Sequence, residues 1–430
     1  MKIKYEFLVV VTFLFVMTGC GKKELPNTYI HGSDFQYMQM NSLGMYMDVQ
    51  QGTEGYYLRH GDYVYYLDES AGKIHPLCNR VDCLHDKETE TRRKENCNAY
   101  VEEKSSFSKG IAYCGGYIYC LDAVHLFDHG EKQILYKISE DGSKKEQVYQ
   151  WTDDRWISRW IIHRNKLYYV EQKYSEKKDG SGLIQTNSLY VIDLTDIVMR
   201  PKLIYTVDSG EIAGSSIAYI TCYGNYVYML LVYEDMTETD NTIQTFEKWM
   251  IYDIEKGKFK ELTLPNMQED EQISDIKFWQ DKILFTVVQG FEQDYSKPTT
   301  IYLADLDGMN AEQYMENIPM GNNFYSDGTY LLKTDEGMVF MAQMDILDYE
   351  KEKVTYWVYD SSLMLVDTFV WPSEVKVDGV PQMGNDKKMY LIYEDSEDSA
   401  HWGVMQWDKN AIGSYNGNAP EMITISYDGG

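Results

Sequence analysis

Trp249-Met250-Ile251-Tyr252-Asp253, followed by Lys256-Gly257-Lys258 and a second apolar run at Phe259–Leu264, is the stretch that decides the fold of this chain. An apolar run that ends in a polar residue, a turn that contains Gly and a second apolar run together predict a β-hairpin. The first run of this unit recurs at Tyr63–Asp68, Leu135–Ser139, Leu189–Asp193, Ile301–Asp305, Tyr356–Asp360 and Val404–Asp408.

The spacing of the repeated unit predicts the architecture. The last residues of these runs mostly lie 48 to 60 residues apart, as in propeller blades. Each unit also has a second pair of strand-like runs upstream, such as Ile217–Tyr223 with Tyr226–Val232. We therefore predict an all-β, seven-bladed β-propeller with four-stranded antiparallel blades over residues 43–430, and Glu421–Tyr427 as its last strand. Six blades are the alternative, if the first unit, Met45–Cys78, is partial.

The N-terminal residues have the pattern of an export signal. A basic start precedes the apolar run Phe7–Met17, which is too short to span a bilayer as a helix. The run ends in Thr18-Gly19-Cys20, which resembles a bacterial lipobox apart from Met17 at its aliphatic position. We expect residues 1–19 to be removed, Cys20 to carry a diacylglycerol on the outer face of the cell membrane, and residues 20–42 to form a flexible tether. An ordinary secretory signal is the alternative.

Composition and charge restrict the partners. Tyr occurs 38 times and Pro only 9 times, which favours a folded, strand-rich chain. The formal net charge is −28, and removal of residues 1–19, which carry +1, makes it −29. Phosphates and anionic lipid surfaces would repel such a chain, so nucleic acid is excluded as a partner. The acidity mainly favours solubility, and we expect a monomer.

A cysteine-rich insert at residues 78–100 lengthens one step of the repeat. The run Leu77-Cys78-x4-Cys83-x-His85-Asp86, followed by Cys97-Asn98-Ala99-Tyr100, is similar to a signature of predicted TolB-like β-propeller lipoproteins of Gram-positive anaerobes. The chain departs from that signature at Val81, where Pro is usual, and in its Lys87–Glu95 insertion. The resemblance implies a propeller fold and an exported location, and it implies no known reaction.

Three interpretations of the cysteines stay open at this point. Outside the cytoplasm, disulfides could form among Cys78, Cys83, Cys97, Cys114 and Cys120. Alternatively, Cys78, Cys83, His85 and Cys97 have the donor types of a closed structural Zn²⁺ site. The third interpretation is a set of unpaired, mostly buried thiols that includes Cys222. The even spacing of Cys114 and Cys120 predicts that both face one side of a strand or hairpin.

Other candidate sites are weaker. Trp151, Trp156 and Trp160 lie close to carboxylates and could bind a sugar, although packing is the more common role of such Trp residues. His125 and His129 could bind a metal, but in a hairpin their side chains need not converge. Long polar loops are expected on one face of the disc, where binding function often collects, and lie at Tyr174–Ile184, Glu234–Glu247, Gln289–Pro298 and Asp395–Ala400.

The sequence contains no Gly-x-Ser-x-Gly, phosphate-loop or His-Glu-x-x-His motif. We therefore expect a membrane-anchored, extracytoplasmic and non-catalytic module that binds a protein, peptide or glycan. The alternative is a propeller hydrolase or lyase acting on extracellular carbohydrate, which would need two carboxylates at a fixed separation in a pocket. No catalytic pair can be chosen from the 68 Asp and Glu residues by sequence.

Overall fold

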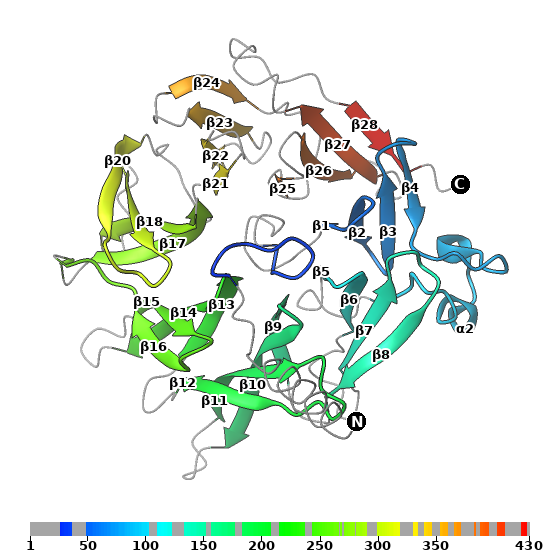
Figure 1. Cartoon of the computed structure of the whole chain (residues 1–430), viewed down its shortest axis with the longest axis horizontal. Coiled ribbons are helices and arrows are strands. Elements are labelled where there is room, and N and C mark those ends of the chain that lie inside the picture. The colour runs from blue at the N-terminus through cyan, green and yellow to red at the C-terminus, as the bar shows by residue number, and fades with distance from the viewer. Residues whose placement is uncertain are drawn as a thin grey trace, which may run out of the picture.

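Seven four-stranded antiparallel sheets form a ring in this computed structural model (Figure 1). The fold predicted from the repeats, a β-propeller of seven blades, is therefore confirmed. The structure describes residues 26–36, 49–102, 110–122, 133–151, 156–176, 183–207, 215–236, 243–265, 267–268, 271–279, 281–289, 299–318, 330–333, 339–345, 353–359, 365–370, 382–383, 388–394, 402–408 and 423–427.

Each sheet consists of four consecutive strands, and the first strand of each set lies nearest the middle of the ring (Figure 1). The first four sheets comprise β1 (Val49–Gln51), β2 (Tyr56–His60), β3 (Tyr63–Asp68) and β4 (Lys73–Pro76); β5 (Ile111–Cys114), β6 (Tyr117–Asp122), β7 (Ile134–Ser139) and β8 (Lys145–Gln150); β9 (Trp156–His163), β10 (Lys166–Glu176), β11 (Leu183–Asp193) and β12 (Lys202–Val207); and β13 (Ser216–Tyr223), β14 (Tyr226–Met236), β15 (Ile243–Asp253) and β16 (Lys258–Glu261).

The other three sheets follow in the same order along the chain. They comprise β17 (Glu271–Trp279), β18 (Lys282–Gln289), β19 (Thr299–Asp305) and β20 (Glu312–Ile318); β21 (Tyr330–Lys333), β22 (Val339–Asp345), β23 (Lys353–Tyr359) and β24 (Leu365–Val370); and β25 (Gln382–Met383), β26 (Lys388–Glu394), β27 (Trp402–Asp408) and β28 (Ile423–Ser426). Short helical turns in the described part include η2 (His85–Lys87) and α2 (Thr91–Lys94). No helix among the described residues is long and apolar enough to cross a membrane.

Buried aromatic side chains fill much of the space within and between the sheets. The largest of the fully buried side chains include Tyr57, Tyr168, Tyr169, Tyr228 and Phe285. Aromatic and β-branched side chains suit a pleated sheet that is covered on both faces, which accounts for the high Tyr content.

In the described part of the chain, the first and last sheets are each built from their own four consecutive strands, and side-chain contacts join the two sheets. β28 lies beside β4 at this seam (Figure 1). Trp402 of the last sheet stacks on His60 of β2, with ring centroids 4.2 Å apart. Tyr65 of β3 packs edge-on against both Trp402 and Tyr427, at 4.8 and 5.1 Å. The first repeat unit therefore forms a complete sheet, and aromatic packing joins that sheet to the last one.

Part of the segment expected to be a flexible tether is docked on the propeller, so that expectation was wrong for residues 26–36. We call these residues the strap. Asp34, Phe35 and Gln36 are buried against the sheets. Figure 1 shows the strap as dark blue chain near the middle of the ring. The sequence did not reveal this because the strap has no periodicity, and its partners lie far along the chain.

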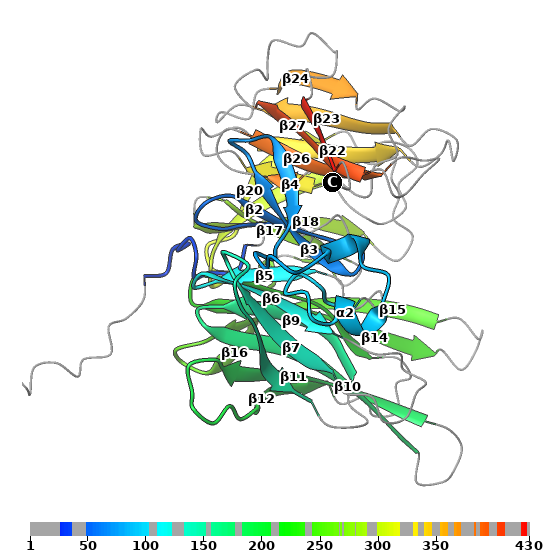
Figure 2. The same cartoon turned by 90° about the vertical axis from the view of Figure 1, so that its right-hand side faces the viewer.

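The described parts of two segments predicted as loops are instead paired strands. β10 and β11 stay paired as far as Glu176 and Leu183, and β14 and β15 as far as Met236 and Ile243. We call these two hairpins the arms, and Figure 2 shows them projecting on the same side of the disc. The expectation that they share one face is met, although their backbone is paired in strands. Residues 290–298 and 395–400 of the other predicted loops lie outside the described residues.

Candidate metal centre and the neighbouring pocket

The cysteine-rich insert leaves the edge of the first sheet and returns to it. The amide of Leu77, just after β4, donates to the carbonyl of Val64 in β3 at 2.8 Å. At the other end of the insert, the amide of Val64 donates to the carbonyl of Ala99 at 2.9 Å, and that of Val101 donates to Asp62 at 2.8 Å. Because β4 is only four residues long, the chain that returns from the insert hydrogen-bonds to β3 beyond the end of β4. The two ends of the insert are therefore held close together.

Four side chains converge where those ends meet. The ligand atoms of Cys78, Cys83, His85 and Cys97 all lie within 4.8 Å of one another. Cys97 is buried and the other three are half-buried. Zn–S bonds of about 2.3 Å in a tetrahedron place sulfur atoms about 3.8 Å apart, so the four donors need to move by only about 1 Å to enclose the ion. The donor set expected from the sequence is thus brought together.

Backbone amides point at the cysteine sulfurs. The amide of His85 donates to Sγ of Cys83 at 3.3 Å. The amides of Arg80 and Asn98 both donate to Cys78. Hydrogen bonds of this kind stabilise a thiolate and fix its direction, as outer partners of metal ligands do. The loop therefore prepares its sulfurs to hold a cation.

The cysteines also share a proton. The thiol of Cys97 donates to Cys78, and this bond is the main reason why the pKa of Cys78 falls to about 4. The same bond, together with burial, raises the pKa of Cys97. A divalent cation at the centre would replace that proton and let both sulfurs bind as thiolates. Three thiolates and one imidazole suit Zn²⁺, so the residues present fit the metal.

His85 has a left-handed backbone, with φ of 54°. This conformation is uncommon for residues other than Gly and is often found at functional sites. It turns the next residue, Asp86, toward the seam of the ring. One carboxylate oxygen of Asp86 accepts the hydroxyl of Tyr65 at 3.2 Å and also that of Tyr427. The candidate metal centre is therefore adjacent to a bridge between the first and last sheets.

Gly142, in the turn between β7 and β8, lies against the start of the insert. Its φ is +69°, and a Cβ at this position would lie 2.8 Å from the backbone nitrogen of Cys78. Its carbonyl accepts the Asn98 side-chain amide at 2.9 Å. Only Gly permits this close approach of two backbones, so the second sheet also supports the metal centre.

The six described cysteines are free, and no bond joins any two of them in this structure. Cys114 and Cys120 also lie on different faces, which corrects the expectation from their even spacing. Cys114 ends β5, whereas Cys120 lies in β6 opposite Ile111, three residues before Cys114. The turn between the strands breaks the two-residue alternation, and the side chains join different core clusters. Cys222 is buried with Cys114 in one of these clusters, away from the insert.

Two of the three Trp residues considered for a sugar site are buried. Trp151 and Trp160 are buried in the core, with only 3% and 6% of their surface exposed, and Trp156 is half-buried. The ring of Trp151 packs edge-on against Tyr149 and Tyr169. Trp151 and Trp160 therefore have a packing role in the core. His125 and His129, the other metal candidates, lie outside the described residues.

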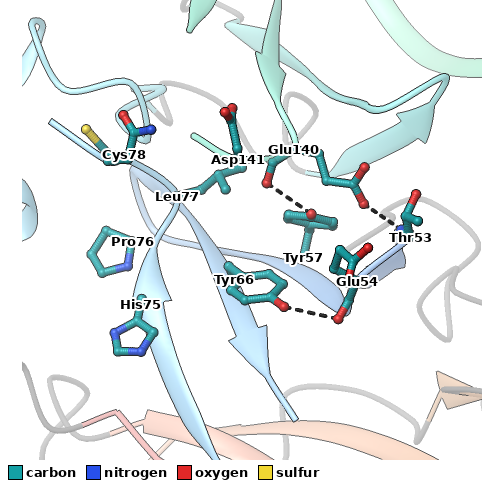
Figure 3. A pocket seen from close by; sticks show the side chains of 11 residues that line it. Thr53, Glu54, Tyr57, Tyr66, His75, Pro76, Leu77, Cys78, Glu140 and Asp141 are labelled. Atoms are coloured by element: carbon teal, nitrogen blue, oxygen red, sulfur yellow. Dashed lines mark hydrogen bonds between the residues drawn. The ribbon is translucent and has the colours of Figure 1, made fainter. Parts of the chain in front are cut away.

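A pocket of about 470 Å³ lies between the first two sheets, beside the metal centre (Figure 3). It is lined by Thr53, Glu54, Tyr57, Tyr66, His75, Pro76, Leu77, Cys78, Asn79, Glu140 and Asp141.

The polar groups of this pocket are mostly engaged with the protein itself. The carboxylate of Glu140 accepts the amide of Thr53 at 2.5 Å (Figure 3). It also accepts the hydroxyl of Tyr113 at 3.2 Å. Asp141 accepts three hydrogen bonds within its own turn, from the Ser139 hydroxyl and from the amide and hydroxyl of Ser143. These bonds lower the pKa of Asp141 to about 2. Carboxylates used in this way stabilise turns rather than supply a general acid.

Two features of the site were not predicted. The motif contained Asp86, but its partner Tyr427 is 341 residues away, and no local signal links the two. Arg164 follows β9, and nothing in the sequence indicated that its guanidinium is buried against Asp34.

No protein-family model matches the chain, and no curated protein matches its sequence. Similar solved structures include an ulvan lyase of a new polysaccharide lyase family, bound to a GlcA(1-4)Rha3S saccharide. That likeness has 10% identity and a TM-score of 0.52, and it covers 92% of this chain and 97% of the lyase. At this identity it shows the fold alone.

Two peptidase structures are more weakly similar. The β-propeller domain of the Trilobed protease from Pyrococcus furiosus, which has an open velcro topology, gives 13% identity and a TM-score of 0.38 over 73% of this chain and 81% of that domain. Dipeptidyl peptidase 4 of Porphyromonas gingivalis gives 10% identity and a TM-score of 0.42 over 90% of this chain. The chain spans 54% of the length of that peptidase.

Proposed function

We propose that this protein is a lipid-anchored, extracytoplasmic β-propeller that works as a non-catalytic binding or scaffold module and carries a structural Zn²⁺. The observation that carries the proposal is the convergence of Cys78, Cys83, His85 and Cys97. Four protein ligands complete a tetrahedron and leave no open position for water or substrate, which is the arrangement of structural zinc sites. Bound there, Zn²⁺ would tie the two ends of the insert together.

The chemistry of the pocket also favours binding over catalysis. Its lining includes three carboxylates and no Lys or Arg. The saccharide in the similar lyase structure contains a uronate and a sulfate, and this lining would repel such anions. The alternative of a carbohydrate hydrolase or lyase therefore rests on the shared fold, which does not fix function.

The proposed anchor is the diacylglycerol on Cys20, which lies outside the described residues. It would hold the protein on the outer face of the cell membrane, with a protein, peptide or glycan as its partner. The arms offer paired strands that project from the disc (Figure 2). Such projections on a rigid scaffold are suited to contact a macromolecule.

Native mass spectrometry of residues 21–430, purified without oxygen or chelator, tests the metal. We expect one Zn²⁺ per chain, lost on Cys83→Ser or His85→Ala substitution and retained on Cys222→Ser substitution, which serves as the matched control. A mass two hydrogens short for each bridge, with no metal, would contradict the proposal. The anchor is tested separately by metabolic labelling with a fatty acid, which the Cys20→Ser protein should not incorporate.

A further inference from the structure

We propose that the strap fixes the orientation of this protein on the membrane. The face that carries the turn between the first and second strands of each sheet lies toward the bilayer, and the arms point away from it. This inference rests on the proposed lipidation of Cys20, and it adds which face of the propeller is left free for a partner.

The strap is attached to four consecutive sheets, always at or beside the turn between first and second strands. Asn27 accepts the amide of Asn225 in the fourth sheet at 2.8 Å. The carbonyl of Ser33 accepts the amide of Arg164 in the third at 2.8 Å, and that of Gly32 accepts Gly115 in the second at 2.9 Å. Gln36 exchanges two hydrogen bonds of 2.7 Å with the backbone of Gln51 in the first sheet. The strap therefore lies against one face of the disc.

A buried ion pair secures the middle of the strap. The Arg164 guanidinium contacts both carboxylate oxygens of Asp34, at 2.8 and 3.1 Å. The same guanidinium donates to the carbonyls of Pro26 and Thr28 at 2.8 and 3.1 Å. Arg164 and Asp34 are only 7% and 1% exposed at their side chains, so water hardly screens the pair. The carbonyl of Pro26, at the exposed start of the strap, is thus tied to the propeller by the same guanidinium.

Next to the ion pair, His163 forms a hydrogen bond with the backbone of the strap. Its Nδ1 accepts the amide of Phe35 at 3.1 Å, and its Nε2 donates to the carbonyl of Gly224 at 2.8 Å. This imidazole is completely buried, and burial lowers its pKa to about 4. It is therefore neutral at physiological pH and makes both bonds at once.

The segment between Cys20 and the strap, which we call the leash, is shorter than the disc is thick. Only residues 21–25 separate Cys20 from Pro26, and these six steps reach about 21 Å when fully extended. The eight residues of β9, which is not part of an arm, extend for about 26 Å through the third sheet at about 3.3 Å each. A leash that starts on one face cannot pass around the disc to bring the opposite face to the bilayer.

The arms lie on that opposite face. Turns between first and second strands are at one end of each sheet, and connections between second and third strands are at the other, because neighbouring strands are antiparallel. Figure 2 shows the strap on one side of the disc and the ends of β10 and β14 on the other. A partner in solution would therefore meet the arms first, and the bilayer would face the strap.

The experiment measures the height of each face above lipid vesicles. The lipidated protein is bound to phosphatidylcholine vesicles that carry an acceptor dye in their headgroups, and a donor dye is attached through an unnatural amino acid at position 73 or 175. Lys73 and Ser175 are both exposed. Lys73 adjoins a turn on the strap face, and Ser175 is nine residues along β10 from Lys166, about 30 Å away. We expect stronger energy transfer from position 73 than from position 175.

A lengthened leash is the matched control. A flexible Gly-Ser insert of about 20 residues between Leu25 and Pro26 leaves the strap and propeller unchanged but frees the disc to turn. The difference between the two positions should then shrink or vanish. Equal or stronger transfer from position 175 in the unmodified protein, or a difference unaffected by the insert, would overturn the proposed orientation. Loss of vesicle binding by the Cys20→Ser protein tests the anchor itself, so failure of the anchor is distinguished from failure of the orientation.

Discussion

Removing the proposed Zn²⁺ should loosen the seam between the first and last sheets, where Tyr427 is far from the candidate ligands in sequence. The Asp86 carboxylate, next to the ligand His85, accepts hydroxyl hydrogen bonds from Tyr65 and Tyr427. Hydrogen bonds to a charged group contribute about 1.5–3 kcal/mol each. Release of the insert by a chelator would therefore remove about 3–6 kcal/mol of stabilisation from the contact between the first and last sheets.

Hydrogen exchange measures this loss directly. The amide of Tyr427 donates to the carbonyl of Trp402 at 2.8 Å, so its protection reports on the last sheet at the seam. A loss of about 3 kcal/mol corresponds to exchange faster by about 100-fold. We expect this acceleration in residues 402–408 and 423–427 on chelation, and no change in β10 and β11, which lie away from the seam (Figure 1).

A Tyr427→Phe variant separates this effect from general loosening. It removes one of the two bonds to Asp86 and should destabilise the metal-loaded protein by about 1.5–3 kcal/mol in urea unfolding. In the metal-free protein the same substitution should cost little, because Asp86 has already been released. Unchanged protection at Tyr427 after chelation, or equal costs of the substitution with and without metal, would refute the coupling between metal and seam.

Three further predictions concern single residues. Gly142→Ala, whose Cβ would clash with the Cys78 backbone, should lower stability by more than about 1 kcal/mol and weaken zinc binding measured by competition with a chelator. Gly72→Ala has a similar φ of +60° and open space around it, so it should leave zinc binding unchanged. Burial lowers the pKa of His163 from 6.5 to about 4, so between these pH values the unfolded chain binds more protons than the folded one. The contribution of His163 to stability is full above pH 6.5 and should fall by about 3 kcal/mol as the pH drops toward 4. Urea unfolding of a His163→Gln variant should lack this dependence of stability on pH. Burial raises the pKa of Cys120 to about 11, so iodoacetamide should modify it only after unfolding, as mass spectrometry would show, and rapid labelling of the native protein would contradict its burial.

The local parts of this protein could be predicted because they depend on neighbouring residues. A hairpin such as Trp249–Glu261 is specified by its alternation and its turn, and β15 and β16 pair there as expected. The four donors of the metal centre lie within 20 residues, and their types alone indicated the chemistry. Even so, the donor types left a disulfide, a metal site and free thiols as open alternatives.

Predictions failed where the face or burial of a side chain depends on a neighbouring sheet. Trp151 and Trp160 could have bound a sugar or packed in the core by sequence, and the assembled sheets bury them in the core. Cys114 and Cys120 were placed on one face by counting residues, and the turn between β5 and β6 reversed that relation. Burial is a property of the assembled ring, so no window of sequence contains it.

The sequence by itself determined the repeat, the all-β architecture and the donor set of the cysteine-rich insert, because hydrophobic alternation, turn chemistry and ligand type act over a few residues. Only the tertiary structure decided that Asp86 meets Tyr427, that Arg164 holds Asp34 and that the strap and the arms lie on opposite faces. These contacts join residues 130 to 341 positions apart. They exist because ring closure brings distant turns and ends together, and their energy comes from buried, charged hydrogen bonds that form only after the sheets have packed.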